Sequence, residues 1–254
     1  MVDLGCWLGS TTAALCRGLA RNSRAATRAL KVHAYDVFTW DRAYDVYAPR
    51  GVHLAHGQSF RPLFERNVRP WLARVAIHEG DLLTQGWAGG PVELLLNDVA
   101  KSFALAAHVW GEFVTRLVPG GLLIEQDFKH HFCPWLHVLH HRFRDHFALA
   151  ADVAAGATTA FWLRRPVPAD QVRALTADAF DDAEVADAIA WAQSLVGREW
   201  RPALDAAHAM WFVHRGRVAE ARDLLAARRA AGVSQFELDA ASAALARLEH
   251  GTTH

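Results

Sequence analysis

The chain has 254 residues, of which 52% are hydrophobic and 21% are charged, so it can bury a core large enough for one globular domain and an appendage. Its 27 basic and 27 acidic residues give a formal net charge of zero, which excludes the strongly basic character of a general nucleic-acid or membrane-surface binder. With three cysteines, no signal-like start and no apolar run of about eighteen residues, the sequence predicts a reduced, cytoplasmic protein without a membrane span.

The first residues predict a short strand, a glycine turn and the start of a helix. Gly5 and Gly9 allow the backbone to approach a ligand closely, and a helix that begins near Ser10 or Thr11 offers unpaired amides to an anion. The pattern is Asp-x-Gly-x-x-x-Gly, and Trp7 stands where a dinucleotide fingerprint requires its second glycine. The turn therefore predicts a nucleotide-like ligand, and the alternative is a glycine turn that only closes a strand–helix unit.

Apolar runs that alternate with helical patterns predict a parallel α/β sheet. The first expected strand begins essentially at Met1, and the next four are residues 31–36, 75–78, 92–98 and 122–125. Asp3, Asp36 and Asp81 stand at three successive strand ends, so three carboxylates are expected at one edge of the sheet. An aspartate at the end of the second strand can accept both hydroxyls of a ribose. A helix cap or a turn is the alternative for Asp36 and Asp81.

A long aromatic and basic insertion, residues 38–71, separates the second and third strands. A connection of this length is usually functional or carries its own helix. We expect the insertion to form a wall of the ligand pocket.

Polar side chains follow the fourth and fifth strands. Asn97 and Asp98 end the fourth strand, and Gln126 and Asp127 follow the fifth. Lys101 stands at the predicted start of an amphipathic helix, where its charge opposes the helix dipole. These side chains are expected to converge above the middle of the sheet, although a solvated lysine is the alternative for Lys101.

The remainder of the chain predicts a hairpin and then helices. Two strands around Gly156, residues 147–150 and 158–163, are typical of an antiparallel hairpin. Residues 164–168 form a linker, and the helices expected beyond it are residues 182–195, 202–214, 218–231 and 235–248. The predicted division is a domain of residues 1–166 and a helical extension of residues 167–254. Residues 209–231 resemble a tetratricopeptide-type hairpin. We expect the extension to pack on the first domain, to form a homodimer or to bind a partner.

The stretch 129–146 contains six histidines, namely His130, His131, His137, His140, His141 and His146. A helix would place three of them on one face, which suggests zinc or copper, but no acidic or cysteine set completes a zinc-type spacing. We therefore expect this helix to pack through its leucines and Phe143 and to display its imidazoles to solvent. His130 and His131, near the end of the fifth strand, are the better functional candidates.

The opening motif, and the Leu-Val-Pro-Gly-Gly run of residues 117–121 before the fifth strand, resemble class I S-adenosylmethionine-dependent methyltransferases. Asp98-x-x-Lys101 with a polar pair after the fifth strand is similar to catechol O-methyltransferase. Gly-Cys-Trp-Leu-Gly-Ser and Val-Pro-Gly-Gly resemble the macrocin O-methyltransferase group, which acts on sugars of natural products. The resemblance implies a doubly wound, Rossmann-like α/β fold with a seven-stranded sheet, a terminal antiparallel hairpin and S-adenosylmethionine as cofactor.

The resemblance also implies roles for individual residues. The cofactor would be bound by Asp3, Gly5, Cys6, Trp7, Gly9, Ser10, Asp36, Asp81 and Asn97. A divalent cation, usually magnesium, would be held by Asp98, Gln126 and Asp127, although those families commonly have two acids or Asp-Asn at the last two positions. The catalytic candidates are Asp98, Lys101 and His130, and a base role for Lys101 requires a strongly lowered pKa.

The predicted function is O-methylation of a small-molecule hydroxyl, on a sugar or another natural product, with neither nucleic acid nor membrane as partner. A second hypothesis is a non-catalytic S-adenosylmethionine-binding module whose helical tail recruits partners. Nicotinamide-dependent oxidoreduction is disfavoured by Trp7 and by the terminal hairpin. Because the motif begins at residue 3, we expect a shortened chain, or a cover for the cofactor supplied by another subunit or by the C-terminal region.

Overall fold

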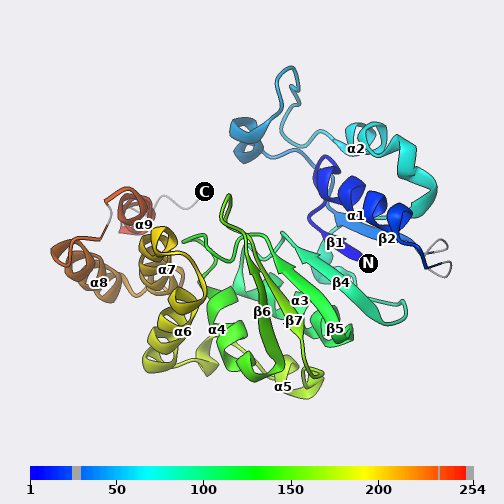
Figure 1. The fold of residues 1–254 in the computed structure, drawn as a ribbon. Helices are drawn as coiled ribbons and strands as arrows, with labels where there is room; N and C mark the ends of the chain where they lie inside the picture. The colour runs from blue at the N-terminus through cyan, green and yellow to red at the C-terminus, as the bar shows by residue number, and fades with distance from the viewer. Residues whose placement is uncertain (25–29, 234, 250–254) are drawn as a thin grey trace.

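The seven strands form one mixed sheet in the order β3-β2-β1-β4-β5-β7-β6 (Figure 1). The computed structural model describes residues 1–24, 30–233 and 235–249. The strands are β1 (Val2–Leu4), β2 (Val32–Asp36), β3 (Val75–Glu79), β4 (Val92–Asn97), β5 (Leu117–Glu125), β6 (Phe147–Asp152) and β7 (Thr159–Leu163). Strands β1 to β5 pair in parallel, and β7 is antiparallel to both β5 and β6. The predicted fold class, including the terminal hairpin, is confirmed.

Strand β5 is longer than the sequence predicts. The expected strand covers residues 122–125, with a helix end and a turn over residues 117–121, whereas β5 already begins at Leu117, which pairs with Val92 of β4. The register between β4 and β5 shifts after Val92, and Gly120 has a φ of 82°. Because glycine adopts this conformation at little cost, the Pro-Gly-Gly run forms an irregular start of the strand and not a turn before it.

Helices cover both faces of the sheet. They are α1 (Ser10–Arg21), α2 (Arg61–Asn67), α3 (Phe103–Glu112), α4 (Pro134–Arg142), α5 (Ala169–Arg173), α6 (Asp182–Leu195), α7 (Arg201–His214), α8 (Val218–Ala230) and α9 (Gln235–Glu249). Val32 and Ala34 of β2 pack in the apolar cluster of α1 and α2. Tyr35 points to the opposite face and joins the cluster that contains α3 and α4. Alternation along β2 thus separates two cores.

The insertion between β2 and β3 carries α2 and two short 3-10 helices, η2 (Arg42–Tyr47) and η3 (Arg69–Arg74). Its core is aromatic: the Phe38 ring lies 5.5 Å from that of Phe60 and 5.2 Å from that of Phe64, measured between ring centroids. The expectation that this long connection carries its own helix is confirmed. Aromatic packing fixes the insertion on α1 at one edge of the sheet.

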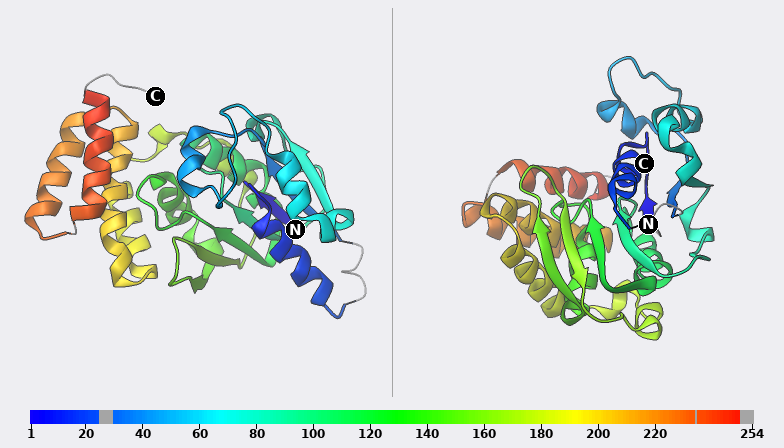
Figure 2. Two further views of the ribbon diagram at one scale, coloured as in Figure 1. Left: turned by 90° about the horizontal axis from the view of Figure 1, so that it is seen from above. Right: turned by 45° about the vertical axis from the view of Figure 1, so that its right-hand side comes forward.

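The chain beyond β7 is helical in its described part, and helices α6 to α9 match the four predicted ones. The short helix α5 was not predicted. Helices α6 and α7 pack against α4, and Arg142 of α4 pairs with Glu184 of α6. The extension therefore packs on the sheet domain, which is one of the three expected arrangements, and lies at the opposite end from α1 and α2 (Figure 2). Among the described residues, no helix is long and apolar enough to span a membrane.

The expectation that the histidines of α4 face solvent is wrong for two of them. His137 and His140 are fully buried, because α6 packs on α4 and the His140 ring stacks on Phe161 of β7. His137 Nε2 donates to the carbonyl of Phe128 at 2.6 Å, and His140 Nε2 donates to Glu125 Oε1 at 3.1 Å. Burial lowers the pKa of His137 to about 4, so it is neutral at physiological pH. Within the described part of the chain, no three His, Cys, Asp or Glu side chains are placed to hold a metal ion.

Candidate functional site

A cleft of about 710 Å³ opens at the carboxyl ends of β1, β2, β4 and β5. This is the edge at which ligands bind in open α/β sheets. Most of the predicted site residues line it, namely Gly5, Cys6, Trp7, Ser10, Asp36, Asp81, Asp98, Lys101, Gln126, Asp127 and His130. The topology therefore brings the predicted cofactor, catalytic and metal residues into one cleft.

The glycine turn fixes the carboxylate of Asp36 at the cleft wall. The Trp7 N–H donates to Asp36 Oδ2 at 2.8 Å, and the Phe38 N–H donates to Oδ1 at 2.9 Å. Trp7 holds a φ of 42°, which is uncommon for a residue with a side chain. Each oxygen of Asp36 keeps a further lone pair, so the carboxylate can still accept two hydroxyl groups of a ligand.

The two glycines of the turn are explained by protein neighbours. A Cβ on Gly5 would lie 2.9 Å from the Asp98 carbonyl oxygen, and a Cβ on Gly9 would lie 2.6 Å from a Val68 methyl group. Both residues also have positive φ, 80° and 89°. Gly5 thus allows the loop after β4 to approach, and Gly9 allows the insertion to pack on α1. The backbone comes close to other parts of the protein at both positions.

Three predicted cofactor residues, Asp3, Gly9 and Asn97, are not among those that line the cleft. Asp3 is fully buried under α1, where the hydroxyls of Thr11 and Thr12 donate to its Oδ2 at 2.9 and 2.5 Å. Its Oδ1 is buried and has no hydrogen-bond partner in the described structure. Burial raises the pKa of Asp3 to about 6.

Asn97 also lies below the cleft, in a buried network. Its Nδ2 donates to Glu125 Oε2 at 2.7 Å, and Glu125 Oε1 accepts from His140. Glu125 is fully buried, so the acid that precedes Gln126 supports the end of β5 from inside. Sequence periodicity gave no sign of this network, because its members come from two strands and a helix.

Asp81 both caps a turn and faces the cleft, which were the two alternatives that the sequence left open. Its Oδ1 accepts from the Leu83 N–H at 3.0 Å, which caps the short 3-10 helix η4 (Leu82–Thr84). The same residue lines the cleft beside Gly80. A turn residue can therefore also face the ligand.

A lysine lies between two carboxylates at the ends of β4 and β5. Lys101 Nζ is 2.9 Å from Asp98 Oδ1 and also contacts Asp127 Oδ2. The side chain of Lys101 is 47% exposed. Helix α3 begins after Ser102, which is its N-cap, so Lys101 lies before the helix and not in its first turn. The cluster faces the cleft from the loop.

The electrostatics of this cluster assign different roles to its members. Burial alone would lower the pKa of Lys101, but the carboxylates of Asp98 and Asp127 raise it above its ordinary value. Lys101 is therefore a stable ammonium and not a general base. Burial raises the pKa of Asp98 to about 6, although the Lys101 charge opposes this shift. A carboxylate with such a pKa can accept a proton near neutral pH.

The three predicted metal ligands lie together but do not fit a metal ion in this arrangement. The ammonium of Lys101 occupies the space between Asp98 and Asp127. Gln126 Oε1 accepts from the Thr158 hydroxyl at 3.0 Å. The oxygen atoms that a hard cation would need already face protein donors, so the predicted magnesium site is not supported.

Several cleft residues were missed by the sequence analysis. Tyr44 and Tyr47 reach the cleft from η2. The sequence predicted that the insertion forms a wall of the pocket, but it did not identify these two residues. Phe132 reaches the cleft from the loop after β5. The Tyr44 ring lies 6.4 Å from that of Trp7, and the Phe132 ring stacks on His130 at 4.7 Å. Nothing in the local sequence marked Phe132, since a single apolar residue in a loop has no characteristic pattern.

The loops that carry the cluster are tied to each other and to the extension. The Ala100 carbonyl, one residue before Lys101, accepts from Trp135 Nε1 at 2.5 Å and from Cys133 Sγ at 3.3 Å. The Trp135 ring lies 4.9 Å from that of His214 in α7. Helix α7 thus supports the segment that positions Lys101.

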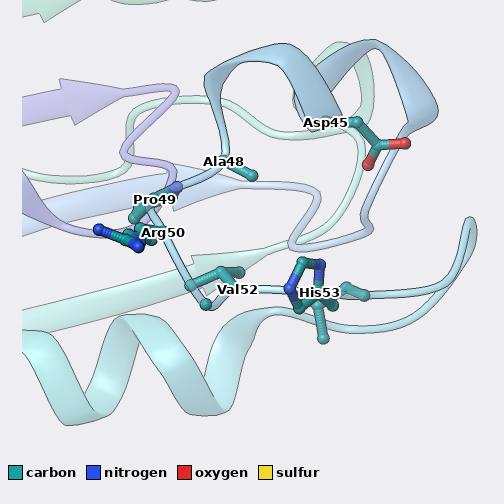
Figure 3. Close-up of a pocket in the computed structure, with 8 residues that line it drawn as sticks. Asp45, Ala48, Pro49, Arg50, Val52 and His53 are labelled. Atoms are coloured by element: carbon teal, nitrogen blue, oxygen red, sulfur yellow. The ribbon is translucent and has the colours of Figure 1, made fainter.

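A second hollow, of about 490 Å³, lies within the insertion (Figure 3). It is lined by Asp45 of η2 and by residues 48–54 of the loop that follows η2. None of the predicted site residues lies there, so the cleft at the strand ends is the better candidate site.

Comparison with known proteins returned similarities to solved structures alone, since no protein-family model and no curated protein matches the chain. The O-methyltransferase NovP is 15% identical over 65% of this chain and 72% of its own, with a TM-score of 0.48. CalS11, a TDP-rhamnose 3'-O-methyltransferase of calicheamicin biosynthesis, is 14% identical over 65% and 70%, with a TM-score of 0.45. An O-methyltransferase family protein from Burkholderia thailandensis is 16% identical over 66% and 51%, with a TM-score of 0.41. Similarities this weak do not extend to substrate or mechanism.

Proposed function

We propose that the chain is an S-adenosylmethionine-dependent O-methyltransferase that acts on a hydroxyl group of a small molecule. The observation that carries the proposal is the Lys101 ammonium between the carboxylates of Asp98 and Asp127, in the same cleft as Asp36. One half of the cleft suits a nucleoside, and the other half suits proton removal from a hydroxyl. Methyl transfer to oxygen needs both.

The cofactor half of the cleft lies over β1 and β2. Asp36 can accept the two ribose hydroxyls, and Trp7 offers aromatic surface. The first turn of α1, at Ser10 and Thr11, presents backbone amides to a carboxylate. When bound, S-adenosylmethionine supplies a methyl group whose bond to sulfur breaks as the bond to the acceptor oxygen forms.

In the acceptor half, Asp98 accepts the proton of the hydroxyl group. Lys101 keeps its charge and donates a hydrogen bond to the oxygen as negative charge develops on it. Asp127 holds the ammonium from the opposite side. Lys101 thus performs the electrostatic role that a cation would otherwise serve, so we propose a reaction that does not depend on magnesium.

Transfer of a labelled methyl group from S-adenosylmethionine to a panel of hydroxyl compounds, in EDTA, tests this function. We expect turnover by the native chain and a loss of about 100-fold or more in Lys101→Met, in line with removal of one oxyanion donor. Lys31→Met, which changes the exposed lysine immediately before β2, is the matched control and should keep full turnover.

Binding should separate from turnover in the same variants. Lys101→Met should bind S-adenosylhomocysteine within about twofold of the native chain, because its ammonium faces the acceptor half. Binding of the cofactor without transfer to any acceptor would favour the non-catalytic module. Turnover that appears only with magnesium would contradict the proposed role of Lys101.

A further inference from the structure

The acceptor half of the cleft has apolar walls. Tyr44 and Tyr47 from η2, Val99 and Leu105 near the start of α3, and Phe132 from the loop after β5 line it. The polar groups at its floor already contact one another: Lys101 pairs with the two carboxylates, and Gln126 Oε1 accepts from Thr158. A ligand in this half therefore meets aromatic and aliphatic surface, with hydrogen-bonding groups gathered at one point.

The charge of the cleft is negative. Its lining contains four aspartates, Asp36, Asp81, Asp98 and Asp127. Within the described lining, Lys101 is the one lysine or arginine, and it contacts two of these carboxylates. A negative cleft attracts a sulfonium cofactor and repels phosphate groups. A nucleotide-activated sugar carries a pyrophosphate, and this lining offers it no free cation.

We propose that the acceptor is an uncharged aromatic compound that is held through one phenolic hydroxyl, and not a nucleotide-activated sugar or a diol that binds through a chelated metal. This inference rests on the proposed methyl-transfer function. The aromatic ring would pack on Phe132 and Tyr44, and its hydroxyl would face Lys101 and Asp98. Lys101 Nζ lies 5.6 Å from the centre of the Phe132 ring, so a ring placed on this wall brings its substituent close to the ammonium.

The acid–base chemistry of Asp98 and Lys101 also favours a phenolic acceptor. A phenol has a pKa of about 10, as in tyrosine, and an aliphatic sugar hydroxyl is a much weaker acid. A carboxylate beside one ammonium can therefore ionise a phenol more readily than a sugar. In the transfer, the oxygen–carbon bond forms as the carbon–sulfur bond breaks, and the phenolic proton passes to Asp98. The products are the aryl methyl ether and neutral S-adenosylhomocysteine.

Calorimetric titration of the native chain, saturated with S-adenosylhomocysteine, tests the inference with three probes. They are 1-naphthol, 2,3-dihydroxynaphthalene and UDP-glucose. We expect both naphthols to bind with similar affinity, with or without magnesium, and UDP-glucose not to bind. Binding of UDP-glucose, a magnesium-dependent preference for the diol, or no binding of 1-naphthol would overturn the inference.

Variants of the wall make the test specific. Phe132→Ala should weaken 1-naphthol binding about tenfold, since an aromatic contact is lost, and Phe132→Tyr should restore it. Leu149→Ala, which changes an exposed apolar residue of β6, is the control and should bind like the native chain. Failure of S-adenosylhomocysteine itself to bind would count against the proposed function, whereas its binding together with loss of the naphthol preference would count against this inference alone.

Discussion

Two lysines occupy comparable places in this molecule and meet different surroundings. Lys101 follows β4 and Lys129 follows β5, and each pairs with aspartate. The Lys129 side chain is fully buried, with Nζ 2.5 Å from Asp152 Oδ1, 2.7 Å from the Val153 carbonyl and 4.6 Å from the centre of the Trp200 ring. Lys101 is 47% exposed. The same ion-pair chemistry is closed off by protein in one case and faces a cleft in the other.

The buried cluster of Lys129, Asp152 and Trp200 joins the sheet to the helical extension. Asp152 of β6 accepts from Lys129 with one oxygen and from the Gly197 N–H, at 2.9 Å, with the other. Trp200 belongs to the 3-10 helix η8 (Arg198–Trp200), which leads into α7. Lys129 lies two residues after Asp127. The buried cluster therefore also anchors the loop that carries Asp127, which pairs with Lys101 at the cleft. We therefore propose that Lys129 contributes to stability and that Lys101 contributes to the reaction.

Lys129→Met should give the largest effect on stability. Removing one partner of a buried ion pair leaves the other charge uncompensated, and we expect the free energy of unfolding to fall by about 3–5 kcal/mol. Lys101→Met should change it by about 1 kcal/mol or less, because the Lys101 side chain is 47% exposed and solvent screens its charge. Urea unfolding of both variants measures the difference. Equal losses in the two variants would remove the distinction between the clusters.

Asp98→Asn should reduce turnover by about 100-fold, as expected for loss of a general base. In the native chain, kcat/KM should fall as the pH decreases through about 6, because the pKa of Asp98 is raised to about 6 and the protonated carboxyl cannot accept a proton. Lys101 lowers this pKa, so residual activity of Lys101→Met should show the same decline at a higher pH. A pH profile without a group near 6 would contradict the role of Asp98.

Trp135→Phe should have the smallest effect on turnover. It changes the contact between α4 and the loop that carries Lys101. The variant loses the hydrogen bond from Trp135 Nε1 to the Ala100 carbonyl, worth about 1 kcal/mol. We expect kcat to fall a few-fold with little change in the affinity for S-adenosylhomocysteine, since the loop of Lys101 is less well positioned. Steady-state kinetics and calorimetry together check this. Unchanged kcat would show that Trp135 serves stability alone.

The positions of the strands along the chain could be predicted because burial leaves a direct mark on the sequence. Central parallel strands are covered on both faces, so β4 appears as a nearly continuous apolar run with polar residues at its end. Carboxyl ends of parallel strands share one edge, and this rule alone brought Asp36, Asp98 and Asp127 to one cleft. Helix α6 was predicted with its observed bounds, and Asp181 caps it.

The failures concern contacts between distant segments. His137 and His140 appeared to be surface residues because nothing local shows that α6 covers their helix. The pairing of Lys101 with both Asp98 and Asp127 depends on how the loops after β4 and β5 lie relative to each other, which the sequence does not show. The sequence therefore predicted a metal at a place where the structure has an ammonium. Residue types indicated where the site lies, and tertiary neighbours decided its chemistry.

The most direct test of the central claim is calorimetric titration with S-adenosylhomocysteine. The native chain should bind it, and Asp36→Ala should bind it at least about tenfold more weakly, because two charge-assisted hydrogen bonds to the ribose are lost. Thermal unfolding of the variant verifies that it is folded. No binding to the native chain, or equal binding by a folded Asp36→Ala, would contradict the assignment of this cleft to a methyl donor.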